Sequence, residues 1–94
     1  MDGIRFEWDE TKNRGNKRKH GMSFEEAQTV FLDEHAVRYY DPNHSRDEDR
    51  FIMLGMSLRL RIIVVCHCYR KGDTVIRIIC ARKADKREAA DYWR

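Results

Sequence analysis

Residues 60–81 read Leu-Arg-Ile-Ile-Val-Val-Cys-His-Cys-Tyr-Arg-Lys-Gly-Asp-Thr-Val-Ile-Arg-Ile-Ile-Cys-Ala, and this stretch decides the fold. In a strand over Leu60–Tyr69, Ile62 and Val64 would face one side and Ile63 and Val65 the other. Two apolar faces are typical of a central strand that is covered on both sides. The turn residues 70–73 then predict a hairpin into a second strand over Thr74–Ala81.

The segments before this hairpin predict further strands and two helices. Phe51–Met56 and Val37–Tyr40 have the composition of strands, and the alternation of apolar and charged residues over 4–8 predicts another. Asp9 is placed to cap a helix over residues 10–20, which contains no large apolar side chain and therefore has no core-facing stripe. Ser23 and Glu26 have the spacing of a capping box that opens a helix over 24–33.

The remaining segment predicts a short C-terminal helix, with Asp85 and Glu88 as its cap. The expected order is therefore β-α-α-β-β-β-β-α, an α+β fold whose C-terminal strands form an antiparallel sheet. With 94 residues and 41% apolar residues, the chain can form a single domain over residues 1–94. No run is long enough for a membrane span, the first residues lack a signal-peptide pattern, and three cysteines favour a reducing compartment, so we expect a cytoplasmic protein.

The net charge of +3 conceals an uneven distribution along the chain. Residues 33–50 contain six acidic and three basic residues, whereas residues 51–94 contain four acidic and ten basic residues. Lys12–Lys19 forms a second basic segment. This separation favours an anionic partner, with nucleic acid as the first candidate, although a merely solvated charged surface would give the same composition.

Several segments, taken in order, resemble the BrnT family, the toxin half of a type II toxin–antitoxin pair. The resemblance covers about residues 4–92 and rests on these stretches: Phe6-Glu7-Trp8-Asp9 with Lys12, Asn16 and Lys19-His20-Gly21, Phe24, Ala27 and Val30-Phe31, Asp49-Arg50 before Gly55, and Arg77-Ile78-Ile79-Cys80-Ala81-Arg82-Lys83-Ala84. Cys80 departs from the family, which usually has serine at this position.

The resemblance implies a small RelE-like fold and a ribonuclease that needs no metal or other cofactor and arrests growth by cutting RNA. It also implies a BrnA-type antitoxin with a ribbon-helix-helix domain, which neutralises the toxin and carries it to operator DNA. The implied assembly is a heterotetramer of two toxins and two antitoxins.

Metal-independent RNA cleavage transfers the scissile phosphate to the neighbouring 2′-hydroxyl, so it needs a base, an acid and cations that face the phosphate. Arg77 and Arg82 are the best candidates for the cations, because a guanidinium can bind two phosphate oxygens. Arg77 could instead pair with an acid such as Asp49 across the sheet. Positions five apart face opposite ways in a regular strand, so both arginines can serve one site only if the strand ends or bulges before Arg82. We expect it to end near Ala81.

His20 is the candidate acid–base group, since imidazole titrates near neutral pH, and Lys19 beside it could stabilise charge. A histidine that only interacts with a helix dipole is the alternative. Further candidates for binding RNA are basic or aromatic residues near these segments, although the aromatic ones also suit a core: Trp8, Lys12, Lys17, Lys83 and Tyr92.

Cys66-His67-Cys68 does not predict a metal site, because the Cys-x₂-Cys spacing of zinc modules is absent. Buried thiols are the favoured interpretation, with His67 as a residue that could line a cleft. Two other functions remain open at this point. One is an RNA- or ribosome-binding module that does not cleave, and the other is a structural corepressor partner of a DNA-binding antitoxin.

Overall fold

The computed structural model describes residues 3–94 and is built on a five-stranded sheet in the order β1-β5-β4-β3-β2. The elements follow the chain as β1 (Arg5–Glu7), α1 (Glu10–His20), α2 (Phe24–Gln28) with a 3₁₀ turn η1 (Thr29–Leu32), β2 (Val37–Tyr40), a 3₁₀ turn η2 (Pro42–His44), β3 (Arg50–Met56), β4 (Ile62–Arg70), β5 (Val75–Lys83) and α3 (Lys86–Trp93). The predicted α+β class and element order are confirmed. None of the helices in the described residues is long and apolar enough to cross a membrane.

The sheet is mixed rather than purely antiparallel. β2 to β5 pair antiparallel as expected, but β1 lies parallel to β5, with Glu7 opposite Arg77. A tight turn sets the direction of neighbouring strands in a hairpin, whereas β1 and β5 are separated by most of the chain, so no turn forces them to be antiparallel.

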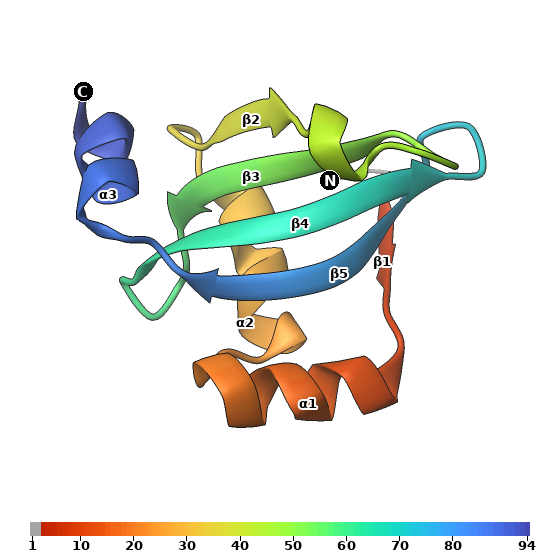
Figure 1. The fold of residues 1–94 in the computed structure, drawn as a ribbon, viewed down its shortest axis with the longest axis horizontal. Coiled ribbons are helices and arrows are strands. Elements are labelled where there is room, and N and C mark those ends of the chain that lie inside the picture. The colour runs from red at the N-terminus through yellow and green to blue at the C-terminus, as the bar shows by residue number, and fades with distance from the viewer. Residues whose placement is uncertain (1–2) are drawn as a thin grey trace.

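Helices cover one face of this sheet, which we call the helix-covered face. Its core is formed by helical and strand side chains that are almost completely buried: Met22, Phe24, Ala27, Val30, Ile63, Val65, Ile78 and Ala81. Gly55 allows this packing, because a Cβ atom there would lie 2.7 Å from Cγ1 of Val30. Figure 1 shows α2 behind the strands and α1 alongside β5.

The opposite side of the sheet, which we call the open face, is bordered by α3 only at one end (Figure 1). The prediction that the central strand is covered on both sides is therefore only partly correct. Val64 and Cys68 of β4 point to the open face and are nevertheless 4% and 1% exposed, because side chains of the neighbouring strands surround them.

A β-bulge in β5 sets which residues share the open face. His67 pairs with Ile78 and Cys66 pairs with Cys80, so Ile79 is the extra residue. An extra residue reverses the alternation of side chains beyond it. Arg77 and Arg82 consequently point to the same face of the sheet. Of the two conditions under which both could serve one site, an end of the strand or a bulge before Arg82, the bulge is the one that is present. The expectation that the strand ends near Ala81 is wrong, since Lys83 still pairs with Ile63.

Two buried asparagines hold the polar helix α1 in place, Asn16 against the sheet and Asn13 against α2. Nδ2 of Asn16 donates to the carbonyls of Met22 at 2.8 Å and Ala81 at 2.7 Å, and its Oδ1 accepts from the N–H of Ala81 at 3.1 Å. Oδ1 of Asn13 accepts from the N–H of Phe24. β1 pairs with β5 only as far as Arg77, and Asn16 bonds the backbone of β5 beyond that point, at Ala81. These bonds explain how a helix without an apolar stripe is fixed to the sheet, and they support β5 as it continues to Lys83.

Candidate functional site

The open face carries the two predicted arginines in a regular grid. Register pairing gives a row of Glu7, Arg77, Cys68 and Arg50, then a row of Cys80, Cys66, Ile52 and Tyr39, then a row of Arg82, Val64, Leu54 and Val37. Arg77 and Arg82 thus stand on either side of the row that begins with Cys80. Both guanidinium groups project from the same strand of a rigid sheet.

Each arginine is paired with a carboxylate. Nη1 of Arg77 donates to Oε2 of Glu7 at 2.8 Å, so the predicted alternative of an acidic partner is correct but the partner is Glu7 rather than Asp49. Arg82 donates to Glu88 through both Nη1 and Nη2, each at 2.8 Å. This two-pronged pairing fixes the plane of the Arg82 guanidinium.

The pairing also determines the charge state of the carboxylate at the end of the sheet. The hydrogen bond from Arg82 holds the pKa of Glu88 below its usual range, and Glu88 raises the pKa of Arg82. Glu88 is therefore ionised at neutral pH. In this state it accepts hydrogen bonds and donates none.

A small hollow of about 210 Å³ lies beside this pair, between the open face and α3. Its lining combines an exposed aromatic ring, apolar strand residues and two acidic residues of α3: Tyr39, Ile52, Leu54, Val64, Glu88 and Asp91. The Tyr39 side chain is 45% exposed, so a flat nucleobase could stack on its ring.

His20 and Lys19 lie at the C-terminal end of α1 and are both exposed. The end of α1 lies near the β3–β4 turn, because Nη2 of Arg61 donates to the carbonyl of Gly21 at 3.4 Å. β5 also finishes at this end of the sheet, where Lys83 pairs with Ile63 on the helix-covered face. The structure thus gathers His20 and Lys19 at the same end as Arg82, but no hydrogen bond joins them to Arg77 or Arg82 among the described residues.

This end of the molecule, which we call the basic end, is richer in cations than the sequence suggested. Its basic side chains come from α1, the β3–β4 turn, the end of β5 and the start of α3: Lys17, Arg18, Lys19, Arg59, Arg61, Arg82, Lys83, Lys86 and Arg87. The acidic segment 41–49 and the hairpin 71–74 lie at the opposite end of the strands, where Arg70 pairs with Glu48. The basic and acidic segments of the sequence are therefore separated in space, at opposite ends of the strands.

An ion pair between the buried Glu26 and the partly exposed Arg61 supports the basic end. Both carboxylate oxygens of Glu26 accept from Arg61, and one also accepts from the Ser57 hydroxyl at 2.7 Å. The capping-box prediction is correct for Ser23, whose Oγ accepts from the N–H of Glu26. The Glu26 carboxylate bonds Arg61 and Ser57 rather than the backbone N–H of Ser23. The hydrogen bond from Arg61 holds the pKa of Glu26 below the usual 4.5.

We expect Glu26→Gln to lower the free energy of unfolding by about 1–2 kcal/mol at pH 7, because a hydrogen bond to a charged group is replaced by a neutral one. A carboxyl whose folded pKa is lowered stabilises the fold fully above pH 4.5 and loses this contribution as the pH falls through the folded pKa. Urea unfolding at pH 7 and pH 3 should therefore show a smaller gap between variant and wild type at the lower pH. A gap that stays constant would contradict the role assigned to the pair.

Two aromatic RNA-binding candidates are engaged in packing. Trp8 is half-buried against Phe24, with ring centroids 6.1 Å apart, and its Nε1 donates to Glu10. The Tyr92 hydroxyl donates to Oδ2 of Asp33 at 2.7 Å, and its pKa is raised to about 12 by burial and by this carboxylate. Both rings thus pack against the rest of the protein, which is the alternative that the sequence left open. Lys12 and Lys17 of α1, the basic candidates on this helix, are exposed.

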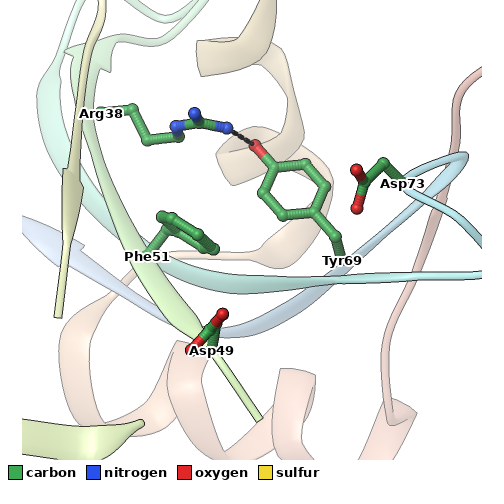
Figure 2. Close-up of a pocket in the computed structure, with 5 residues that line it drawn as sticks. All are labelled: Arg38, Asp49, Phe51, Tyr69 and Asp73. Carbon is green, nitrogen blue, oxygen red and sulfur yellow. Dashed lines mark hydrogen bonds between the residues drawn. The ribbon is translucent and has the colours of Figure 1, made fainter. Parts of the chain in front are cut away.

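A different pocket, of about 440 Å³, lies on the helix-covered face at the acidic end (Figure 2). Its lining includes Arg38, Phe51 and Tyr69, and Figure 2 shows the Arg38 guanidinium directed at the Tyr69 hydroxyl, 2.9 Å away. Asp49 and Asp73 complete the lining. This pocket lies across the sheet from Arg77 and Arg82.

His67 lies beneath this pocket and does not line a cleft, as the sequence had allowed. It is completely buried among Phe31, Phe51 and Tyr69. Burial lowers its pKa to about 4, so the ring is neutral at physiological pH. The three thiols are free, and Cys68 is buried as expected. Among residues 3–94 no group of three or more potential ligands is arranged to hold a metal ion.

The sequence did not single out several residues that complete the open face. The sequence predicts Glu7 and Tyr39 only as strand residues and Glu88 only as a helix cap. Glu7 alternates with Phe6 in β1 and so had to face away from the core, which is a signal that could have identified it. The partner of Arg82 could be found only from the path of α3.

The chain is similar to a known protein family and to a solved structure. A profile of the family described as "Ribonuclease toxin, BrnT, of type II toxin-antitoxin system" matches residues 8–88. The crystal structure of the Brucella abortus ribonuclease toxin BrnT is similar, with a TM-score of 0.63 and 25% identity over 88% of this chain and 99% of that one. No curated protein sequence gives a significant match. The chain therefore belongs to the BrnT family of ribonuclease toxins of type II toxin–antitoxin systems.

Proposed function

We propose that this toxin is a metal-independent endoribonuclease whose active site lies on the open face and that arrests growth by cutting RNA in the cytoplasm. The observation that carries the proposal is the bulge at Ile79, which turns Arg77 and Arg82 to one side of the sheet. Arg82 lies beside the hollow of Tyr39 and Glu88 through its pair with Glu88, and Arg77 lies on the same face on the other side of the row that begins with Cys80. A ribonuclease needs such a clamp around the scissile phosphate.

In this mechanism the 2′-hydroxyl attacks the neighbouring phosphorus and the 5′-oxygen of the next nucleotide leaves. Arg77 and Arg82 stabilise the charge that builds on the phosphate oxygens. Their carboxylate partners hold the guanidinium groups in place until RNA binds, and Glu88 accepts the proton of the 2′-hydroxyl once the RNA phosphate has displaced it from Arg82. His20, with Lys19 beside it, approaches from the basic end and donates a proton to the leaving oxygen.

RNA on either side of the scissile phosphate follows the basic end. Lys17 of α1 and Lys83 of β5 are exposed cations at this end, and Lys12 is exposed in the first turn of α1; we expect all three to neutralise flanking phosphates. Trp8 and Tyr92 contribute base contacts only through the exposed part of each ring, since both are held by packing and hydrogen bonds. No cofactor takes part in the proposed reaction.

Neutralisation requires a partner protein, which we expect to be a BrnA-type antitoxin with a ribbon-helix-helix domain. An exposed apolar surface around α3 supports a protein partner: Leu58, Leu60 and Trp93 are 71%, 79% and 67% exposed around a hollow of about 420 Å³. Operator DNA would then be contacted through the antitoxin, in an assembly of two toxins and two antitoxins.

The test uses purified protein and single-stranded RNA in buffer with EDTA. Cleavage should proceed and leave 2′,3′-cyclic phosphate ends, because the attacking group is the neighbouring 2′-hydroxyl, and a 2′-deoxy substitution at the cut position should abolish it. Expression without the antitoxin gene should stop growth. Intact RNA from a folded sample that still binds RNA would indicate a binding module instead.

A further inference from the structure

Cys66 and Cys80 form a facing pair at the centre of the open face. They lie directly opposite each other on β4 and β5, next to the bulge at Ile79. Both are half-buried, whereas Cys68 is only 1% exposed. All three thiols are free, so the pair is present in its reduced form.

The register places the two sulfurs within bonding reach. Directly opposed residues of antiparallel strands have Cα atoms about 4.5 or 5.5 Å apart. Disulfides span Cα distances of roughly 4.4–6.8 Å, so either kind of pairing accommodates a bridge with little movement of the strands. Cys68 has no such partner, because Arg77 and Arg50 lie opposite it.

The surroundings activate one of the two thiols. The Cys66 thiol, as a hydrogen-bond donor, lowers the pKa of Cys80, and the positive charges of Arg82 and Arg50 lower it further. The same contact with Cys80 and burial raise the pKa of Cys66. Cys80 also lies two residues before Arg82 on the same face of β5, so we take Cys80 as the nucleophile of the pair and Cys66 as the thiol that resolves its oxidised form.

We propose that Cys66 and Cys80 are a reversible oxidation site, at which a peroxide converts the pair into a cross-strand disulfide. The Cys80 thiolate attacks one peroxide oxygen, so that an S–O bond forms, the O–O bond breaks and hydroxide leaves to become water. The Cys66 sulfur then attacks the resulting sulfenic acid of Cys80. An S–S bond forms, the S–O bond breaks, and the hydroxide departs with the Cys66 proton as a second water. Two thiols lose two electrons in total and the peroxide gains them.

The position of the pair links its oxidation to the RNA site, a consequence that rests on the proposed function. The row that contains Cys80 and Cys66 separates the rows of Arg77 and Arg82. A bridge would fix β4 to β5 beside the bulge and remove the thiolate that faces Arg82. Because the bridge removes a negative charge beside Arg82, oxidation should change the rate of RNA cleavage, and dithiothreitol should restore the original rate.

The experiment treats the full chain with hydrogen peroxide and counts thiols under denaturing conditions, independently of any RNA assay. The reduced protein should show three thiols and the oxidised protein one, and peptide mapping should assign the bridge to Cys66 and Cys80. Cys80→Ser and Cys66→Ser should each prevent the bridge. Cys68→Ala is the matched control, since it removes the third thiol and should leave bridge formation unchanged.

Three results would overturn the proposal: retention of all three thiols, a bridge that includes Cys68, or oxidation only between two molecules on a non-reducing gel. If the intramolecular bridge forms but the rate of RNA cleavage is unchanged, the oxidation site stands and its effect on the RNA site is refuted. If the chain cleaves no RNA in either state, the proposed function fails, whereas the thiol count still decides the oxidation site.

Discussion

Arg82→Ala is expected to slow RNA cleavage by about 10²–10³-fold, the usual cost of removing one preorganised donor from a developing anion. Arg77→Ala should have an effect of the same order. Both guanidinium groups point to the open face and neither supports the core, so the loss should appear in the cleavage rate rather than in stability. The Arg82–Glu88 pair is partly exposed, and breaking it should change the free energy of unfolding by less than about 1 kcal/mol.

The matched control for this prediction is Arg46→Ala. Arg46 is an exposed arginine in the acidic segment, at the opposite end of the strands, so its removal changes the net charge equally but leaves the open face intact. Arg82→Lys should recover only part of the rate, because an ammonium group cannot make the two-pronged contact. Single-turnover cleavage of one labelled RNA by all variants checks these expectations. Equal rates for Arg82→Ala and Arg46→Ala would refute the proposed clamp.

Asn16→Ala is expected to lower the free energy of unfolding by roughly 3–4 kcal/mol, since each buried backbone group left without a partner costs about 1–3 kcal/mol. The asparagine side chain is the partner of the Met22 carbonyl and of both the carbonyl and the N–H of Ala81. Without it, α1 loses its anchor to the sheet and the last residues of β5 lose the bonds at their free edge. For a domain of this size such a loss is a large part of the total stability.

Urea denaturation followed by circular dichroism measures this effect. Arg18→Ala, an exposed change on the same helix, serves as the control and should shift the midpoint very little. A loss of less than about 1 kcal/mol in Asn16→Ala would mean that water replaces the asparagine at the edge of β5.

The strands and the fold class could be predicted from the sequence because their signals are local. Alternation in residues 4–8, the apolar run of β4 and the turn at residues 70–73 each depend on neighbours in the chain. The capping box of Asp85 and Glu88 is local in the same way and is present as predicted.

Features that depend on distant residues could not be predicted. α1 lacks an apolar stripe, and only the tertiary fold shows that Asn16 reaches Ala81, 65 positions later. The bulge at Ile79 gives no sequence signal, yet it decides whether Arg77 and Arg82 share a face. An acidic partner for Arg77 could be predicted, but not that it would be Glu7, because β1 joins the sheet through a pairing that no turn specifies.

In the proposed function RNA binds the open face, and amide NMR with an uncleavable RNA tests this binding site. The probe is a short single-stranded RNA with 2′-deoxy sugars throughout the cleavable positions, titrated into the isotope-labelled full chain. We expect the largest shift changes at Cys66, Cys80 and Arg82, with smaller ones along the last turn of α1. Amide shift changes centred on the pocket of Arg38 and Phe51, with the open face unaffected, would contradict RNA binding at the open face.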